Sequence, residues 1–173
     1  MSGPADGGGP GPSAQRLAGQ VIALLRARQQ TVAVAESLTG GLLGAALTGI
    51  PGASVVFRGG VIAYATELKT ALLGVPAALL AARGAVDPDV AAAMADGVRE
   101  RLAATVGAAT TGVAGPDAAD GKQPGTVHIA VSAGAAGPVT RALALPGGRD
   151  EVRRRTVQEA LALLYEVLRE DPG

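Results

Sequence analysis

Ser37 and Thr39 stand directly before a Gly-Gly pair that opens a predicted helix. Backbone N–H groups and the positive end of the helix dipole converge at such a helix start, so a serine oxygen presented there would lie beside donors for an oxyanion. The spacing therefore favours a nucleophilic serine at Ser37. The alternative is that Ser37 only caps the helix, which is the ordinary role of a serine in that place.

A nucleophilic serine needs a base, and the chain has no cysteine and one histidine, His128. Only Lys69 and Lys122 are lysines among 15 basic residues, so lysine is not this chain's ordinary surface cation. Lowering a lysine pKa from ~10.4 to ~7 takes roughly 4.6 kcal/mol, which burial and a nearby cation can supply. Lys69 is therefore a candidate neutral base, and Tyr64, five residues earlier, could share its pocket. The alternative is an exposed helix lysine beside Glu67.

Two further turns could hold an anionic part of a ligand. Residues 110–116 (TTGVAGP) leave a predicted strand through a glycine turn, which exposes successive amides to a phosphate or a carboxylate. Arg149 follows a Gly-Gly pair at the start of the last predicted helix and could reach a substrate phosphate. The known nucleotide fingerprints are missing, because no GxGxxG occurs and the segment from Gly115 to Lys122 has the wrong spacing for a P-loop.

The remaining polar residues are interpreted as structural. Residues 153–155 (RRR) form a solvated basic stretch, and Asp117 and Asp120 are typical of loop turns. His128 lies on the less apolar face of its predicted strand, where we expect a packed, hydrogen-bonded histidine. We therefore assign no metal and no cofactor.

The composition excludes several classes of function. Fifteen Lys+Arg balance fifteen Asp+Glu, so no net charge attracts the chain to nucleic acids or anionic membranes. Zinc, haem and iron–sulfur sites lack their ligands, and three aromatic residues cannot form a base-stacking surface. No apolar run approaches the ~18 residues of a membrane span, and the first residues lack a signal-peptide pattern. We expect a cytoplasmic protein that binds neither nucleic acid nor membrane.

Apolar residues are over-represented in this chain. Hydrophobic residues make up 48% and the 26 glycines come in addition, whereas soluble domains contain about 45–50% of both together. Charged residues reach 17%, against about 25% in an average domain. A chain with this many apolar and so few charged residues is expected to bury part of its apolar surface in a homo-oligomer.

The elements that must position these residues alternate between helix and strand. Apolar periodicity predicts helices over residues 13–29, 42–47, 66–73, 76–83, 88–104 and 150–168. It predicts strands over residues 31–35, 55–64, 106–111, 125–132 and 139–145, the last two as a hairpin. A bulge or bend is expected at Gly59-Gly60, and Asp87 and Asp150 are predicted as N-caps. Residues 1–12 are expected to be a disordered tail and residues 13–170 a single layered α/β domain.

Taken together and in order, these motifs resemble the CinA C-terminal domain family, whose enzymatic members are nicotinamide-nucleotide amidohydrolases, also called nicotinamide mononucleotide deamidases. The similarity covers about residues 15–168. The matching segments are 35–54 (AESLTGGLLGAALTGIPGAS), 57–64 (FRGGVIAY), Lys69 with 72–75 (LLGV), 84–86 (GAV), 111–116 (TGVAGP), 124–127 (PGTV) and 147–153 (GGRDEVR). Each segment alone is weak evidence for the family, but the order and spacing of all the segments together are specific to it.

The resemblance implies a three-layer α/β/α sandwich with a mixed, mostly parallel sheet. It also implies metal-independent hydrolysis of the carboxamide of nicotinamide mononucleotide to nicotinic acid mononucleotide and ammonia. Ser37 matches the family's nucleophile, Lys69 its base and Tyr64 the adjacent tyrosine. The residues matched to substrate binding are Glu36, Thr39, Gly40, Gly41, Thr111, Gly112, Gly115 and Arg149.

In the implied mechanism, Lys69 takes the proton of Ser37, and backbone amides near residues 39–41 hold the oxyanion. Tyr64 relays or donates a proton to the departing ammonia. The chain departs from the usual family pattern at Leu38, Asp87, Thr105 and the Pro116-Asp117 pair, and the last of these affects substrate detail.

Two other functions stay open. One is a catalytically silent module that binds a nucleotide or a partner, and the other is an amidase acting on another small amide. The larger family protein also carries an N-terminal nucleotide-pyrophosphatase-like domain, for which 173 residues leave no room, so a stand-alone amidohydrolase is expected.

Overall fold

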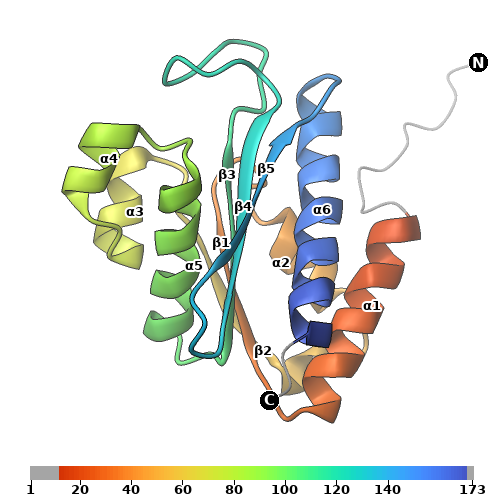
Figure 1. The fold of residues 1–173 in the computed structure, drawn as a ribbon. Coiled ribbons are helices and arrows are strands. Elements are labelled where there is room, and N and C mark those ends of the chain that lie inside the picture. Colours follow the sequence, from red (N-terminus) through yellow and green to blue (C-terminus); the bar gives the residue numbers. More distant parts are fainter. Residues whose placement is uncertain (1–11, 171–173) are drawn as a thin grey trace, which may run out of the picture.

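Five strands form one mixed sheet in the computed structural model, which describes residues 12–170 (Figure 1). The strands are β1 (Val32–Glu36), β2 (Phe57–Ile62), β3 (Val106–Gly112), β4 (Thr126–Ala133) and β5 (Val139–Ala144). Their order across the sheet is β2-β1-β3-β4-β5. β1 pairs in parallel with β2 and β3, and β4 pairs antiparallel with β3 and β5. Only β4 therefore runs against the other four strands, and the last two strands form the predicted hairpin.

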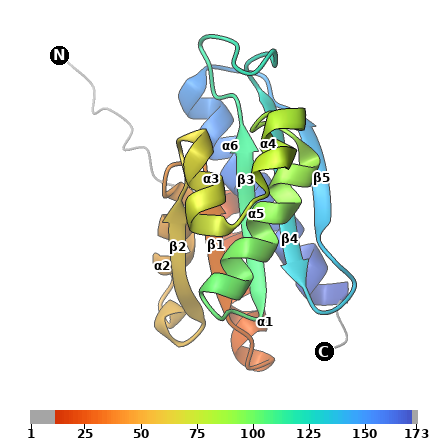
Figure 2. The ribbon, with the colours of Figure 1, turned by 90° about the vertical axis from the view of Figure 1, so that its left-hand side faces the viewer.

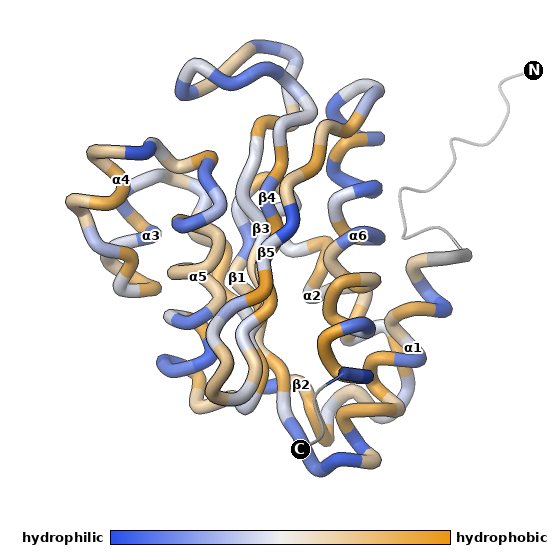
Figure 3. The backbone as a smooth tube through the Cα atoms, viewed as in Figure 1, coloured by the Kyte–Doolittle hydropathy of each residue, from blue (hydrophilic) through white to orange (hydrophobic). Residues whose placement is uncertain are grey.

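Helices cover both faces of the sheet, which confirms the three-layer α/β/α fold (Figures 1 and 2). One layer consists of α1 (Pro12–Ala27), α2 (Leu42–Thr48) and α6 (Arg149–Glu170). The other consists of α3 (Thr66–Leu73), α4 (Ala77–Arg83) and α5 (Pro88–Arg101). In Figure 3, α6 alternates between hydrophilic and hydrophobic residues along its length, as expected of a helix with one buried face. None of the helices within residues 12–170 is long and apolar enough to cross a membrane.

The two faces of the sheet carry side chains of different size. Val32 and Val34 of β1 pack in the core beneath α1 and α6, whereas Ala33 and Ala35 pack in the core beneath α5. The α5 side is close-packed, because a Cβ built at Gly107 of β3 would lie 2.1 Å from a backbone oxygen of α5. Small residues on this face therefore let α5 approach the sheet.

Most predicted elements are found with shifted ends. β2 begins at Phe57 because a short 3-10 helix, η1 (Ala53–Val55), precedes it. The predicted bulge lies one residue earlier than expected, since Val32 pairs with Phe57 and Ala33 with Gly59, which leaves Arg58 unmatched. α5 ends at Arg101 and not near residue 104, because Ala103 adopts a left-handed backbone conformation (φ 50°).

The predicted helix starts are partly confirmed. Asp87 caps α5, and its Oδ1 accepts a 2.8 Å hydrogen bond from the amide of Asp89. The prediction for Asp150 is wrong, because α6 already begins at Arg149 and Asp150 lies in its first turn. α1 begins at Pro12, and the rest of the predicted N-terminal tail, residues 1–11, lies outside the described residues.

The sheet brings the predicted site residues to one edge. β1, β2 and β3 are parallel, so their carboxyl ends meet at the same edge, where Ser37, Ala63 and Val113 follow the three strands. The long loop of residues 113–125 rises above this edge, and α6 begins beside it (Figure 1). Ligands of α/β proteins bind at the carboxyl ends of parallel strands, so this edge is where a site is expected.

Candidate active site

Ser37 and Lys69 lie in contact although 32 residues separate them in the chain. Lys69 Nζ is 3.2 Å from Ser37 Oγ and donates a 2.8 Å hydrogen bond to the carbonyl of Ala63. Ser37 follows β1 and Lys69 lies on α3, which begins just after β2, so the parallel pairing of the two strands places them together. Lys69 is only 1% exposed, so the alternative of an exposed helix lysine is wrong.

Burial lowers the pKa of Lys69 below its usual value, because a low-dielectric environment disfavours the charged amine. The negative charges of Asp120 and Glu67 act in the opposite direction and only partly offset the effect of burial. The cation that the sequence analysis invoked is not among the causes. A lysine with a lowered pKa can accept the proton of a neighbouring serine, so this pair can generate a serine nucleophile.

A cavity of about 260 Å³ opens over the pair. Its lining includes Ser37, Lys69, Tyr64 and Arg149, together with residues 111–115. The structure thus brings the three predicted catalytic residues and the predicted TG turn around one space. A ligand in this cavity would contact the serine, the lysine and the arginine at the same time.

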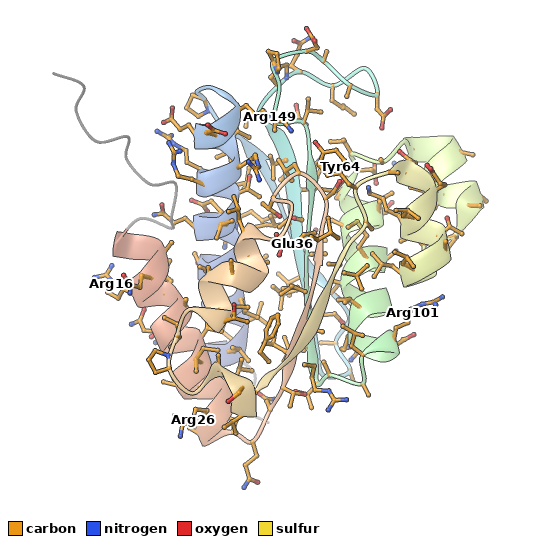
Figure 4. The ribbon with its side chains drawn as sticks, turned by 180° about the vertical axis from the view of Figure 1, so that it is seen from behind. Arg16, Arg26, Glu36, Tyr64, Arg101 and Arg149 are labelled. Atoms are coloured by element: carbon orange, nitrogen blue, oxygen red, sulfur yellow. The ribbon has the colours of Figure 1, made fainter. Side chains whose placement is uncertain are left out.

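The side chains of Tyr64 and Arg149 are hydrogen-bonded to each other in the upper part of the molecule (Figure 4). Arg149 Nη2 donates a 2.9 Å hydrogen bond to the Tyr64 hydroxyl, and Nη1 donates a 2.7 Å bond to the carbonyl of Gly115. Tyr64 is 56% exposed and makes no hydrogen bond to Ser37 or Lys69 within residues 12–170. The expected proton relay through Tyr64 therefore has no direct contact to run along, and the phenol belongs with Arg149 in the wall of the cavity.

Glu36 lies in the middle of the molecule and does not line this cavity (Figure 4). Its buried carboxylate accepts three backbone hydrogen bonds at the start of α2. Oε2 is 3.0 Å from the amides of Gly41 and Leu43, and Oε1 is 2.7 Å from the amide of Gly44. Glu36 was predicted to contact the substrate, but the structure places its carboxylate elsewhere. The carboxylate already accepts hydrogen bonds from the free backbone amides at the start of α2.

Replacing Glu36 with glutamine is expected to lower the free energy of unfolding by roughly 2–4 kcal/mol. Glutamine has an NH2 group in place of one carboxylate oxygen, and this group cannot accept a hydrogen bond from the backbone amides at the start of α2. Chemical denaturation measures this change. Glu100→Gln, on the exposed side of α5, is the matched control and should leave the stability unaltered. A Glu36→Gln protein as stable as the parent chain would show that the carboxylate does not hold the turn.

The glycine pair supports the turn and supplies no oxyanion donors, which corrects the prediction for these two residues. Gly40 and Gly41 have φ of 57° and 104°, so the turn requires residues without a side chain. The Gly40 amide donates to the carbonyl of Ser37 at 3.1 Å, and the Gly41 amide donates to Glu36. Thr39 is fully buried, and its hydroxyl is 2.8 Å from that of Thr110.

The TG turn lines the cavity with its backbone. The Thr111 hydroxyl is buried and donates to the carbonyl of Ala85 at 2.7 Å, so it is already satisfied within the protein. A Cβ at Gly112 would lie 2.7 Å from the carbonyl of Thr126, so glycine is needed there for the close approach of β4. Gly115 has φ of 89° and presents its carbonyl to Arg149.

Two residues that were interpreted as loop-turn residues lie at the cavity. Asp117 and Asp120 line it, and Asp120 Oδ2 accepts a 3.0 Å hydrogen bond from the amide of Ala85. His128 is packed as predicted, but its buried Nδ1 has no hydrogen-bond partner within the described chain, and burial lowers its pKa. No group of three or more His, Cys, Asp or Glu residues between positions 12 and 170 is arranged to hold a metal ion.

Arg153 is the main residue that the sequence analysis missed. It is not part of a solvated stretch, because its guanidinium donates to the carbonyls of Leu38 and Thr39, next to Ser37. The signal in the sequence was its position four residues after Arg149, which puts both side chains on one helix face. Arg155, by contrast, pairs with Glu151 on the surface.

Comparison with known proteins identifies relatives of this chain. The sequence model of the CinA C-terminal domain matches residues 14–168. The chain is 55% identical to a CinA-like protein of Frankia casuarinae over 152 residues and 49% identical to one of Gemmatimonas aurantiaca over 158 residues. These alignments cover 88% and 91% of this chain but 35% and 37% of the relatives. The chain therefore spans little more than a third of the length of the relatives it matches.

Solved structures show the same fold over nearly their whole length. The crystal structure of the competence/damage inducible protein CihA from Agrobacterium tumefaciens is 35% identical, with a TM-score of 0.87, over 98% of this chain and 100% of that one. A CinA superfamily protein from Escherichia coli is 30% identical, with a TM-score of 0.86, over 96% and 95%.

Proposed function

Because the chain belongs to the CinA C-terminal domain family over residues 14–168, we propose that it is an amidohydrolase that converts nicotinamide mononucleotide to nicotinic acid mononucleotide and ammonia. The observation that carries the proposal is the buried Lys69 amine 3.2 Å from Ser37 Oγ in the lining of a cavity. Binding alone requires no amine beside a serine, whereas amide hydrolysis requires a base at that place.

In the proposed first step, Ser37 Oγ attacks the carboxamide carbon while neutral Lys69 takes the hydroxyl proton. The carbonyl π bond opens, and its electron pair forms an oxyanion. The amide of Leu38, beside Ser37 in the cavity lining, has no acceptor within the described chain, and it replaces the glycine amides as the donor that we assign to this oxyanion. The tetrahedral intermediate then collapses, the C–N bond breaks, and the proton held by Lys69 passes to the departing ammonia.

The second step returns the serine. Water attacks the acyl carbon of the Ser37 ester, Lys69 accepts a proton from it, and the ester C–O bond breaks. The proton then returns to Ser37 Oγ, which leaves the acid product. The proposed reaction steps use no metal ion or redox cofactor, so the reaction is expected to proceed in the presence of a chelator.

The test is ammonia release by the purified chain from nicotinamide mononucleotide at neutral pH with EDTA present. Ammonia together with an equal amount of nicotinic acid mononucleotide supports the proposal. If the nucleotide binds but no ammonia forms, the chain is a silent binding module. If other small amides are hydrolysed and nicotinamide mononucleotide is not, the mechanism stands and the substrate is wrong.

Replacing Arg149 with methionine is expected to raise the KM for nicotinamide mononucleotide by roughly 10- to 100-fold, because a charge-assisted contact to phosphate is lost. Its guanidinium faces the cavity between Tyr64 and Gly115, away from the Ser37–Lys69 pair, so kcat should change much less. Nicotinamide riboside, which lacks the phosphate, is the internal control. An equal loss with both substrates would contradict a phosphate role for Arg149.

A further inference from the structure

The carboxylate of Asp120 is held in place at the cavity. Ala119 and Lys122 exchange two backbone hydrogen bonds of 3.1 and 2.8 Å, which closes a tight turn in the long loop. The two central residues of this turn, Asp120 and Gly121, have φ of 52° and 70°, as a type I′ turn requires. From this turn, Asp120 Oδ2 accepts a 3.0 Å hydrogen bond from the amide of Ala85, so the loop is anchored to the segment before α5.

The segment that holds Asp120 is itself tied to the sheet. The carbonyl of Ala85 accepts a 2.7 Å hydrogen bond from the buried hydroxyl of Thr111, at the end of β3. A Cβ built at Gly84 would lie 3.4 Å from Asp120 Oδ2, so the carboxylate lies against this segment. Thr111, Ala85 and Asp120 all line the cavity. The protein therefore positions the carboxylate before any ligand binds.

The charge of Asp120 acts at the place where the reacting carboxamide would lie. Asp120 and Glu67 are the two negative charges that raise the pKa of Lys69, and Asp120 has the larger effect. Of these two carboxylates, only that of Asp120 belongs to the cavity lining. Lys69 Nζ is bonded to Ser37 Oγ at 3.2 Å. A negative charge that acts on this amine therefore also acts on a group bound at Ser37.

The proposed substrate carries a positive charge close to its carboxamide. In nicotinamide mononucleotide the carboxamide is attached to C3 of a pyridinium ring, and the permanent positive charge is centred two ring bonds away, at N1. When the carboxamide carbon is at Ser37 Oγ, this ring charge lies near Lys69 and within the field of Asp120. The reaction requires neutral Lys69, which leaves Arg149 as the only cation in the described lining. A cationic ring is therefore attracted to the free charge of Asp120.

We propose that Asp120 is a specificity-determining residue, whose carboxylate favours a carboxamide on a cationic ring over a neutral carboxamide of the same shape. The inference rests on the proposed function, and it names the part of the nucleotide that the site recognises besides the phosphate. Arg149 and Asp120 then divide the recognition, because the first attracts the phosphate and the second attracts the ring. A neutral aromatic amide reaches Ser37 and Lys69 but gains nothing from Asp120.

The test measures binding by titration calorimetry in the Ser37→Ala background, so that no ligand is consumed. Nicotinamide mononucleotide is the cationic ligand. Benzamide riboside 5′-phosphate is the neutral one, with the same phosphate, ribose and carboxamide on an uncharged ring. Asp120→Asn is expected to raise the Kd for nicotinamide mononucleotide by roughly 5- to 20-fold and to change that for the neutral nucleotide less than about twofold. Asparagine keeps an oxygen that can accept the hydrogen bond from Ala85, so the loop stays anchored.

Glu67→Gln is the matched control, because Glu67 also acts on Lys69 but does not line the cavity. This variant should leave the ratio of the two Kd values unchanged, which separates a direct effect on the ring from one transmitted through the charge of Lys69. An equal loss of both ligands in Asp120→Asn would assign the carboxylate to the ribose hydroxyls or to the loop alone. That result, or no loss of either ligand, would overturn the inference.

Failure of the proposed function gives a different result from failure of this inference. A chain that prefers the cationic nucleotide through Asp120 but releases no ammonia keeps the inference and loses the hydrolysis. A chain that releases ammonia but binds both nucleotides equally keeps the hydrolysis and loses the inference. If neither nucleotide binds, the inference is overturned whether or not ammonia is released.

Discussion

The Ser37→Ala variant is expected to release ammonia from nicotinamide mononucleotide about 10⁴-fold more slowly than the parent chain, or slower still. The loss is this large because Oγ is the atom that forms the bond to the carboxamide carbon, and no other side chain of the site can replace it. The fold should remain, since the only hydrogen bond of this hydroxyl within residues 12–170 is the one with Lys69. Ammonia release and thermal unfolding of the same preparation measure the two effects.

Ser132→Ala is the matched control for this variant. Ser132 is as deeply buried as the site residues, and its hydroxyl donates a 2.6 Å hydrogen bond to Asp96 on the outer part of α5, outside the cavity. Its loss should lower the melting temperature and leave kcat unchanged. A Ser37→Ala protein that keeps more than about a tenth of the parent activity would rule out Ser37 as the nucleophile.

The order of helices and strands could be predicted because it depends on local patterns. Buried strands such as Val106–Gly112 are short apolar runs, and α5 is marked by an Asp-Pro start that the structure retains. The mixed sheet followed from the late hairpin. The element ends were less predictable, because they depend on details such as the left-handed residue Ala103 and the 3-10 turn before β2.

The Ser37–Lys69 pair could be predicted because both residues are unusual for their places in the chain. A serine before a glycine pair and one of only two lysines stand out in the sequence itself. What the sequence could not show is how the amides of the turn are shared. Glu36 occupies the amide of Gly41 and those of the helix start, and this depends on the buried path of its side chain.

The spacing from Arg149 could place Arg153 on the same helix face, but its contact with the turn after β1 could not be predicted, because its partners lie 114 and 115 residues earlier. Three consecutive arginines on an amphipathic helix are typical of a solvated surface. Only the packing of α6 beside α2 brings the first of them to the turn after β1. Long-range contacts of this kind depend on the relative placement of elements, which local patterns do not encode.

Replacing Lys69 with methionine is expected to abolish turnover, so the pH dependence that Lys69 causes is measured on the parent chain. In the parent, kcat/KM should fall as the pH decreases through the lowered pKa of Lys69, because a protonated amine cannot accept the serine proton. This acid limb of the pH profile, the range over which kcat/KM falls, lies below the pKa of ~10.4 of an ordinary lysine. Lys122→Met removes the other lysine, which is exposed, and should keep both the rate and the limb.

The same lowered pKa also predicts how stability depends on pH. Unfolded Lys69 stays protonated up to about pH 10.4, whereas the folded chain releases this proton at a lower pH. Between these two values the unfolded state binds more protons, so the free energy of unfolding rises with pH by up to about 1.4 kcal/mol per pH unit. Below the pKa of the folded state this contribution is lost.

Lys69→Met lacks the titrating amine, so the parent chain should gain stability relative to this variant as the pH rises toward that of an unfolded lysine. Denaturant unfolding of both proteins over a series of pH values measures the difference, which cancels the titration of all other groups. The absolute stability of the variant does not enter, so a methionine that packs well or badly shifts the whole curve without changing its slope. A difference that stays constant with pH would mean that Lys69 keeps its proton in the folded chain, and a protonated Lys69 could not serve as the base for Ser37.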